Sequence, residues 1–379
     1  MNRKIFSTIV IFTGTVVGAG IFGIPYVIAK VGFILGLIYL MLLGVVVTII
    51  LLAYGEVILR TKKFHQATGY AEKYLGKWGK LLMSFSLVAG IYGALLAYMI
   101  GVGDFLYTVL HGLFGGSPIL YSAIFFAIAS MAIMFGLGMI LKIEKGMFIL
   151  LFIVAIFIFV IGINKVDLNN LASLHLENIF LPFGVILFAF TGISAIPDMS
   201  RVLGEDKKLL KKSIVLGMFI VFVIYLLFTF IIVGVSGQNT SQEAIIGLKD
   251  ILGAKIILIG AIFGILAMTT SFLTLGLALK EMYSQDYGLD KTLAWVLTCF
   301  VPFILFILGL SSFVEVLGIV GSITGGFSSI LILAMYRRAK KRGDQEPEYL
   351  IKIPNFVIYI LYIIFGLAVL YQVYYIFFQ

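Results

Sequence analysis

A pattern of glycine, four further residues and proline occurs twice, each time inside a long apolar segment. The first copy runs from Gly20 to Pro25 and the second from Gly192 to Pro197. Glycine lifts steric limits on the backbone and proline cannot donate to a helical ladder, so each copy predicts a helix that stops, unwinds and restarts. Because free backbone groups at membrane depth are costly unless protein or a water-filled cavity satisfies them, two matching interruptions indicate the central binding site of a transporter.

The composition places the chain in a lipid bilayer. Hydrophobic residues make up 62% of the 379 residues and charged residues 12%, which leaves more apolar surface than one water-soluble core can hide. The first apolar stretch, from Ile5 to about Ala29, is too long for the core of a signal peptide, so we expect it to remain as a span. Cys299 is the only cysteine, which excludes an intramolecular disulfide and a multi-cysteine metal site.

Apolar windows of about 20 residues predict an all-α integral membrane protein with eleven transmembrane helices. The predicted spans cover residues 5–29, 33–58, 81–111, 118–141, 146–163, 179–200, 213–235, 254–279, 292–309, 313–335 and 354–377.

The distribution of basic residues predicts the orientation. If the N-terminus is cytoplasmic, the outer segments hold only Lys30, Lys165, Lys249 and Lys255 of the 27 Lys and Arg residues, as the positive-inside rule requires. The C-terminus then lies outside. Because the basic residues are dispersed and form no single stripe, the net charge of +9 does not indicate a nucleic-acid partner.

The two interrupted spans hold equivalent places in the two halves of the chain. If residues 1–165 (spans one to five) and 166–336 (spans six to ten) form repeats, the odd helix number makes the repeats inverted, and 337–379 adds a cytoplasmic linker and span eleven within one domain. Half-helices starting near Pro25 and Pro197 would direct free amides at the midplane, where they favour a carboxylate. The carbonyls ending the preceding half-helices favour an ammonium group or a coupling cation. A free amino acid carries both charges.

Four motifs carry a resemblance to a known family. They are Thr13-Gly14-Thr15-Val16-Val17-Gly18-Ala19-Gly20-Ile21-Phe22-Gly23-Ile24-Pro25-Tyr26, Tyr98 to Asp104, Phe188-Ala189-Phe190-Thr191-Gly192 and Thr269-Thr270-Ser271-Phe272-Leu273. The chain resembles the amino acid/auxin permease family, which includes the hydroxy and aromatic amino acid permeases, of the amino acid-polyamine-organocation superfamily. The resemblance implies a leucine-transporter-type 5+5 inverted repeat with broken helices 1 and 6, one extra C-terminal helix, and transport by alternating access.

The resemblance also implies a substrate site at the two breaks. The amides of Ala19, Gly20 and Ile21 would hold the substrate carboxylate, and Phe188 would close over the ligand. The implied substrate-binding residues are Gly18, Ala19, Gly20, Ile21, Tyr98, Phe188, Thr191, Gly192 and Ser194. The alternative interpretation is that the glycines only allow close helix packing and that the aromatic side chains line helix contacts.

A sodium site between spans one and eight is implied in the same way. Its five oxygens would come from the carbonyls of Gly14, Val17 and Ala267 and the hydroxyls of Thr270 and Ser271. Alternatively, the two hydroxyls donate back to carbonyls of their own helix. Sodium-coupled relatives often have Asn at the place of Gly14, whereas some proton-coupled relatives put a Lys amine there from span five. No ionisable residue lies between Lys145 and Lys165, so Na+ is favoured over H+ as coupling ion, and no other cofactor is expected.

Charged residues at the inner ends of spans one and eight predict a gate. Arg3 or Lys4 would pair with Glu281 or Asp286 when the cytoplasmic path is shut.

Two connections carry helix signals. The inner one, from Arg60 to Lys80, mixes aromatic and basic side chains and suits a helix at the headgroup boundary. On the outer side Thr240, followed three residues later by Glu243, fits a capping box that would start a short helix.

The second break predicts the substrate class. No charged residue occurs between Ile186 and Ile196, so a charged substrate side chain would lack a partner. We therefore expect a neutral, hydrophobic or aromatic amino acid, and leave open whether it is aromatic (Tyr, Trp or Phe) or aliphatic (Ala, Leu or Val). Neither a His-Glu-x-x-His nor a Gly-x-Ser-x-Gly run occurs, so an enzyme is not expected. A transporter-fold amino acid sensor and an ion channel remain as alternatives.

Overall fold

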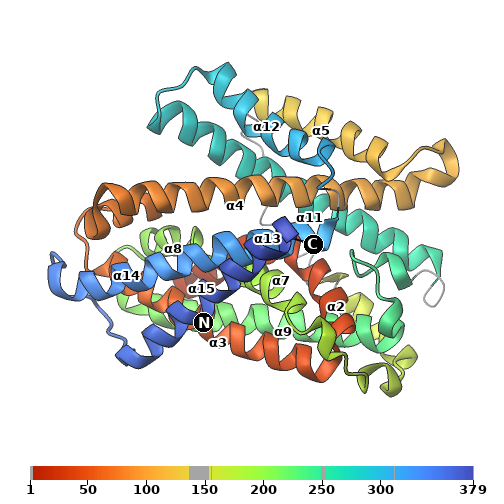
Figure 1. The fold of residues 1–379 in the computed structure, drawn as a ribbon, viewed down its shortest axis with the longest axis horizontal. Coiled ribbons are helices and arrows are strands. Elements are labelled where there is room, and N and C mark those ends of the chain that lie inside the picture. The colour runs from red at the N-terminus through yellow and green to blue at the C-terminus, as the bar shows by residue number, and fades with distance from the viewer. Residues whose placement is uncertain (1–2, 136–152, 155, 249–252, 311, 379) are drawn as a thin grey trace.

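The protein is a bundle of helices packed side by side (Figure 1). The structure is a computed structural model and describes residues 3–135, 153–154, 156–248, 253–310 and 312–378. Within those ranges the only β-type pairing is an isolated bridge between Ser241 and Ala244.

The helices of the first half begin with a broken pair. They are α1 (Arg3–Val16), α2 (Gly20–Val31), α3 (Phe33–Leu59), α4 (Ala67–Phe114) and α5 (Pro118–Phe135), followed by Ile156–Lys165 and the 3-10 turns η1 (Ile163–Lys165), η2 (Leu168–Leu171) and η3 (Leu176–Asn178).

The second half repeats the broken pair and ends on a long apolar helix. Its elements are α7 (Leu181–Phe190), α8 (Ala195–Leu203), η4 (Lys207–Leu209), α9 (Leu210–Ser236), η5 (Gly237–Asn239), η6 (Ile246–Leu248), α11 (Ala254–Glu281), η7 (Met282–Asp286), α12 (Lys291–Ile307), α13 (Phe313–Val320), η8 (Gly321–Gly325), α14 (Gly326–Arg342) and α15 (Asn355–Phe378). Of these, η7 and η8 are π-helical segments.

Length and hydropathy identify membrane-crossing helices in the described part of the chain. Eight are long and apolar enough to cross a bilayer, or nine when the bent pair α1 and α2 is counted as one span, and Ile156–Lys165 and α12 are shorter apolar helices. The predicted fifth span, 146–163, lies partly outside the described residues, so the count of eleven stays a prediction.

Both predicted interruptions are present. The first span stops at Val16 and restarts at Gly20 with a bend of 59°, so its break precedes the Gly20–Pro25 run. The prediction that the second half-helix starts near Pro25 is therefore wrong, because Pro25 lies inside α2. The other interrupted span stops at Phe190 and restarts at Ala195. Each break lies within an apolar segment of the sequence, as expected when Gly and Pro interrupt a helix that the bilayer would otherwise keep continuous.

The long helix α4 crosses the whole molecule and packs against α5, α11, α13 and α14, whereas α9 packs against α1, α2 and α3 (Figure 1). Large aromatic side chains such as Phe12, Phe22 and Phe190 fill the space between helices and are fully buried. Apolar side chains also cover the outside: Ile34 and Leu42 of α3 are more than 60% exposed. A surface of this kind needs lipid around it.

The connection from Arg60 to Lys80 contains a helix, as predicted, whereas its place at the headgroup boundary stays a prediction. The helix forms the start of α4 from Ala67, and a non-helical residue, Gly76 (φ 80°), separates it from the spanning part. Glycine fits there because a positive φ is strained for residues with a Cβ.

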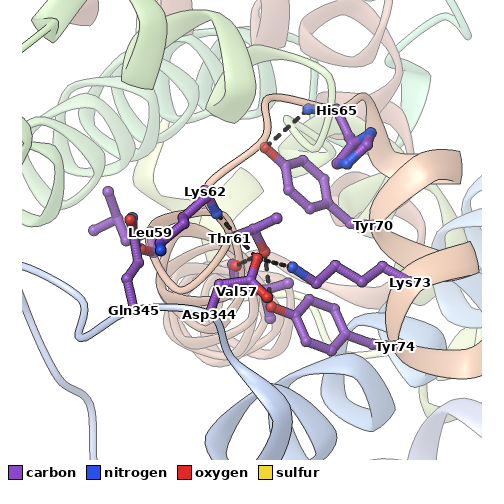
Figure 2. A network of polar contacts seen from close by, with 10 residues as sticks. All are labelled: Val57, Leu59, Thr61, Lys62, His65, Tyr70, Lys73, Tyr74, Asp344 and Gln345. Atoms are coloured by element: carbon purple, nitrogen blue, oxygen red, sulfur yellow. Dashed lines mark hydrogen bonds and ion pairs between the residues drawn. The ribbon is translucent and has the colours of Figure 1, made fainter.

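The connection between α14 and α15 lies against the loop between α3 and α4 (Figure 2). Asp344 forms an ion pair with Lys73 of α4 and accepts a hydrogen bond from the Lys62 amide (3.2 Å). Gln345 donates to the Leu59 carbonyl (2.7 Å). We call these contacts of Asp344 and Gln345 the clasp, because they tie the end of α3 and the start of α4 to the segment before α15.

The connection after α9 does not form the helix that was predicted to start at Thr240, so that prediction is wrong. The Thr240 hydroxyl donates to the Gly237 carbonyl (2.7 Å) and contacts the Ser236 hydroxyl (2.7 Å), so it turns back and does not cap Glu243. Ala244 then has a φ of +60°, which no α-helix accepts.

Candidate substrate-binding site

The first break leaves peptide groups free on both sides. Among the described residues, the amides of Ala19 and Gly20 have no backbone acceptor, and the carbonyls of Gly14 and Val17 have no hydrogen-bond donor. The Gly18 amide turns back to the Val16 carbonyl (3.1 Å). Free amides at a helix start attract an anion, and free carbonyls attract a cation.

The second break has the same character. Within the part of the chain that the structure describes, the amides of Gly192, Ile193 and Ser194 find no backbone acceptor. The Thr191 hydroxyl donates to the Leu187 carbonyl one turn earlier (2.9 Å). Ser194 is exposed, so its hydroxyl is available to a ligand.

The two breaks are in direct contact. A Cβ at Gly20 would lie 2.5 Å from the Cβ of Ala189, and a Cβ at Gly192 would lie 2.8 Å from Val16 Cγ2 and 2.9 Å from Phe12 Cε2. Only residues without side chains permit this approach. Close packing of the glycines and a functional break therefore occur together here, and the first does not exclude the second.

Three of the residues proposed from the sequence meet at Gly18. A Cβ at Gly18 would lie 3.3 Å from the Tyr98 hydroxyl of α4 and 3.8 Å from the Ser271 hydroxyl of α11. Tyr98 is 6% exposed, so its hydroxyl points inward to the break. Helices far apart in the sequence thus bring two hydroxyl groups beside the free amides. Ala19 and Ile21, which flank this point, are buried.

Phe188 lies half-buried at the end of α7, beside the π-helical segment η8. A Cβ at Gly321 would lie 2.7 Å from the Phe188 amide nitrogen, so the two backbones are in contact. Within η8, the Thr324 carbonyl accepts a hydrogen bond from the Ser86 hydroxyl of α4 (2.8 Å). Short π-helical segments inside helices are frequent at functional sites, and no pattern in the sequence indicates this one.

The proposed sodium ligands of α11 lie near the first break, but one of them, Thr270, forms hydrogen bonds within its own helix. The Thr270 hydroxyl donates to the carbonyls of Ala267 (2.9 Å) and Leu266 (3.1 Å), as the alternative interpretation expected. The described residues hold no group of three His, Cys, Asp or Glu side chains suited to a metal ion. A cation at this site would therefore depend on carbonyl and hydroxyl oxygens, which suits a hard ion.

Tyr225 of α9 is a site residue that sequence reasoning missed. Its hydroxyl lies 3.0 Å from the Val16 carbonyl oxygen and 2.8 Å from the Ala189 carbonyl oxygen, so it contacts both broken helices. In the sequence it is one of 19 tyrosines and stands in a uniformly apolar run, which provides no signal of its role.

The breaks are accessible from one end of the molecule. Gly14 and Thr15 of α1 are exposed, as are Thr191 and Ser194, whereas every residue of Gly20–Pro25 is buried. The site therefore opens along α1 and is closed along α2.

The open end is the end that carries the clasp. Lys4 at the start of α1 donates to the Leu203 carbonyl at the end of α8 (3.2 Å). Arg201 of α8 lies over the ring of Phe64, 4.6 Å from its centroid, in the loop that the clasp holds.

The residues of the predicted gate lie at this end too. Arg3 and Glu281 are exposed, and neither forms an ion pair with a described residue in this conformation. Lys4 instead pairs with Asp206 (2.6 Å), and this hydrogen bond holds the pKa of Asp206 below its usual value. The side chain of Asp286 lies outside the described residues, so the gate stays a prediction.

Two cavities lie away from the breaks. An apolar one of about 620 Å³ lies between α4, α5 and α11. A polar one of about 470 Å³ lies between α2, α7, α13 and α15. Neither is lined by Gly18 or Thr191, so the site is identified by its free peptide groups and not by a closed cavity.

Comparison with known proteins agrees with this architecture. Residues 1–373 match the tryptophan/tyrosine permease family. The chain is 26% identical over 356 residues to glutamine transporter 2 of Aliivibrio fischeri, which covers 91% of this chain and 92% of the relative. It is 24% identical over 370 residues to tyrosine-specific transport system 1 of Haemophilus influenzae, with 92% of this chain and 91% of the relative covered.

Solved structures share the fold at low sequence identity. MhsT in complex with L-phenylalanine superposes with a TM-score of 0.68 at 16% identity, covering 97% of both chains. Mhp1, a nucleobase-cation-symport-1 family transporter in a closed conformation with bromovinylhydantoin bound, gives a TM-score of 0.66 at 12% identity, covering 97% of this chain and 91% of Mhp1. At these identities both likenesses concern the fold alone.

The curated relatives are transporters and not enzymes, which agrees with the absence of catalytic motifs. An apolar helical bundle with two broken spans in contact, and a match over nearly its whole length, identify this chain as an integral membrane amino acid transporter that belongs to the tryptophan/tyrosine permease family.

Proposed function

We propose that the chain is a secondary active transporter that carries neutral, hydrophobic or aromatic amino acids by alternating access. The observation that carries this proposal is the contact between two helix breaks, with free amides at Ala19 and Gly20 and free carbonyls at Gly14 and Val17. An α-carboxylate pairs with the amides, and an ammonium group or a coupling cation pairs with the carbonyls. The remaining surface is left for the substrate side chain.

The substrate side chain is neutral because the residues around the breaks offer it no charge. Tyr98, Phe188, Thr191 and Ser194 supply one phenol, one aromatic ring and two hydroxyls. A charged side chain there would lose its hydration without gaining a partner. The relatives named for glutamine and tyrosine, and the L-phenylalanine complex of MhsT, support a neutral amino acid.

Transport is coupled to a cation gradient, with Na+ preferred over H+. The carbonyls of Gly14, Val17 and Ala267 and the hydroxyls of Thr270 and Ser271 are the proposed ligands. Gly14 is exposed on the open side of the site, so an ion reaches it from solvent. Thr270 bonds within its own helix in this conformation, so its hydroxyl would turn toward the ion upon binding.

The proposed topology has eleven spans in two inverted repeats, residues 1–165 and 166–336, with 337–379 added. The N-terminus lies in the cytoplasm and the C-terminus outside, in keeping with the positive-inside rule. With this orientation the open end of the site, along α1 and α8, faces the cytoplasm, and the structure represents an inward-facing state. The wider relationship proposed from the motifs is to the amino acid/auxin permeases.

Uptake by purified protein in liposomes tests the proposal. Radiolabelled tyrosine, tryptophan, phenylalanine, leucine, alanine and glutamine are offered with an inward Na+ gradient or an inward H+ gradient, and protein-free liposomes serve as the control. We expect concentrative uptake of neutral amino acids that collapses when the Na+ gradient is dissipated. Binding without uptake would favour a sensor, and substrate-evoked current without counterflow would favour a channel.

A further inference from the structure

Tyr225 places one hydroxyl between the ends of two half-helices. The oxygen lies 3.0 Å from the carbonyl of Val16, the last residue of α1, and 2.8 Å from the carbonyl of Ala189, next to last in α7. The side chain is fully buried, and its ring lies 5.4 Å from the ring of Phe190. A phenol has one proton, so the two carbonyls share it.

The breaks deprive these two carbonyls of their helical partners; the Val16 carbonyl also accepts from the Gly18 amide (3.1 Å), whereas no described backbone amide donates to the Ala189 carbonyl. In an unbroken α-helix the Val16 carbonyl would accept from the Gly20 amide, and the Ala189 carbonyl from the Ile193 amide, four residues on. Neither amide has a backbone acceptor in the described part of the chain. The Tyr225 hydroxyl thus takes the place of both missing amides.

The hydrogen bonds of Tyr225 matter most when no substrate is bound. Without Tyr225 the Val16 carbonyl would keep only the Gly18 amide, and the Ala189 carbonyl would have no donor among the described residues. Because a buried carbonyl without a donor is unfavourable, both breaks would then tend to close into continuous helix. Closing would consume the Gly20 amide, which the substrate carboxylate is proposed to use. A donor supplied from α9 removes that tendency and leaves the amides free.

We propose that Tyr225 is a positioning residue that keeps both breaks open, and joined to each other, before the substrate arrives. The hydroxyl need not touch the substrate. It acts through the backbone of Val16 and Ala189, and its consequence for transport rests on the function proposed above.

Replacing the hydroxyl alone tests this role. Tyr225→Phe keeps the ring against Phe190 and removes the donor. We expect KM for the amino acid to rise at least tenfold while the maximal rate changes less than threefold, because the binding-competent state becomes rare without substrate but is restored at saturation. If the Tyr225 side chain only filled space, its replacement would change the stability of the protein and would not raise KM relative to the maximal rate.

The matched control is Tyr336→Phe. Tyr336 is also buried, and its hydroxyl donates to a carbonyl, that of Ile351 (2.7 Å), away from the breaks. We expect its KM to stay within twofold of wild type. Replacing Tyr225 by 4-aminophenylalanine, which keeps an N–H donor at the same place, should restore KM to within threefold. If Tyr225→Phe does not accumulate, 4-fluorophenylalanine fills the hydroxyl's space without donating and takes its place.

A second measurement does not depend on transport. Hydrogen–deuterium exchange of the segments around Gly20 and Ile193, without substrate, should slow in Tyr225→Phe as the amides return to helical bonds, and should not change in Tyr336→Phe. The role of Tyr225 would be overturned if Tyr225→Phe left both the exchange unchanged and KM within twofold of wild type. It would also be overturned if KM rose equally in Tyr336→Phe. Absence of uptake by the wild type under either gradient, with exchange altered as expected, would overturn the proposed function and leave the inference standing.

Discussion

Gly20 and Ala189 touch where the two broken spans meet: a Cβ added to Gly20 would lie 2.5 Å from the Cβ and 2.6 Å from the Cα of Ala189. Carbon atoms in ordinary contact lie about 3.5–4.0 Å apart. The backbone of Gly20 therefore lies too close to Ala189 to leave room for a side chain. The same closeness lets Tyr225 reach Val16 and Ala189 at once.

A methyl group at position 20 should separate the breaks. Gly20→Ala forces backbone atoms apart, and overpacking of this kind costs about 1–3 kcal/mol. Since 1.4 kcal/mol corresponds to a factor of ten, we expect uptake at low substrate concentration to fall by about 5- to 140-fold, measured in proteoliposomes. The control is Gly366→Ala in α15, where the structure leaves open space around the added Cβ. Equal activity of the two variants would contradict the close approach.

Thr270 should affect the ion more than the amino acid. Removing its hydroxyl takes away one of the five proposed oxygens, so Thr270→Ala should raise the half-saturating Na+ concentration about tenfold or more. The readout is uptake at saturating amino acid over a Na+ titration. Thr298→Ala is the matched control, because the Thr298 hydroxyl also donates to its own helix, at Ala294 (2.8 Å), but in α12. A Na+ dependence that is identical in Thr270→Ala and wild type would exclude Thr270 as a ligand.

The breaks were predictable because their cause is local. Gly20, Pro25, Gly192 and Pro197 limit the backbone wherever the segment lies, and the helices end within a few residues of them. Hydropathy likewise sets the helix ends, as in the predicted span 33–58 and the observed α3. Both arguments need no knowledge of neighbours.

The contacts that hold the breaks together were not predictable from the sequence. The role of Tyr225 depends on the rotation of α9 against α1 and α7, which no short pattern encodes. The helix predicted at Thr240 failed for a related reason: its hydroxyl had a nearer acceptor, the Gly237 carbonyl, than the motif assumed. Motifs name candidate partners, and tertiary packing decides among them.

The clasp should contribute modest stability that depends on pH. Hydrogen bonds from Lys73 and the Lys62 amide hold the pKa of Asp344 below its usual 3.8. A carboxylate with a lowered pKa stabilises the fold above its usual pKa, and this contribution is lost as pH falls through the lower value. Asp344→Asn should lower the thermal midpoint by roughly 1–2 °C at pH 7, as expected for an exposed ion pair.

The effect of Asp344→Asn should shrink toward zero as the pH is taken below 3.8. Thermal unfolding in detergent over a pH series measures it. Glu346→Gln, an exposed carboxylate in the same connection, is the control and should leave the midpoint unchanged at every pH. A difference between Asp344→Asn and wild type that persists unchanged in acid would contradict the ionic origin.

Two acidic side chains meet at the end of the molecule opposite the clasp. Glu243, in the connection after α9, is hydrogen-bonded to Asp104 of α4, and two carboxyl groups in that arrangement hold a proton between them. The neighbouring residues Ala244 and Ile245 are fully buried, and a Cβ at Gly260 of α11 would lie 2.7 Å from Ile245. The acid pair thus fastens a buried turn to α4.

The turn at residues 241–248 should loosen as pH rises. Burial raises the pKa of Glu243 above its usual 4.5, and the hydrogen bond with Asp104, which acts in the opposite direction, does not cancel this effect. A raised pKa means that the contact is fully present below 4.5 and is lost as pH rises through the higher value. Hydrogen–deuterium exchange of 241–248, corrected for intrinsic rates, should therefore accelerate with pH in the wild type and stay slow in Glu243→Gln, which keeps a neutral donor. The control is Glu177→Gln, at an exposed carboxylate, in which exchange should accelerate with pH as in the wild type. If exchange also accelerates with pH in Glu243→Gln, another group controls the turn.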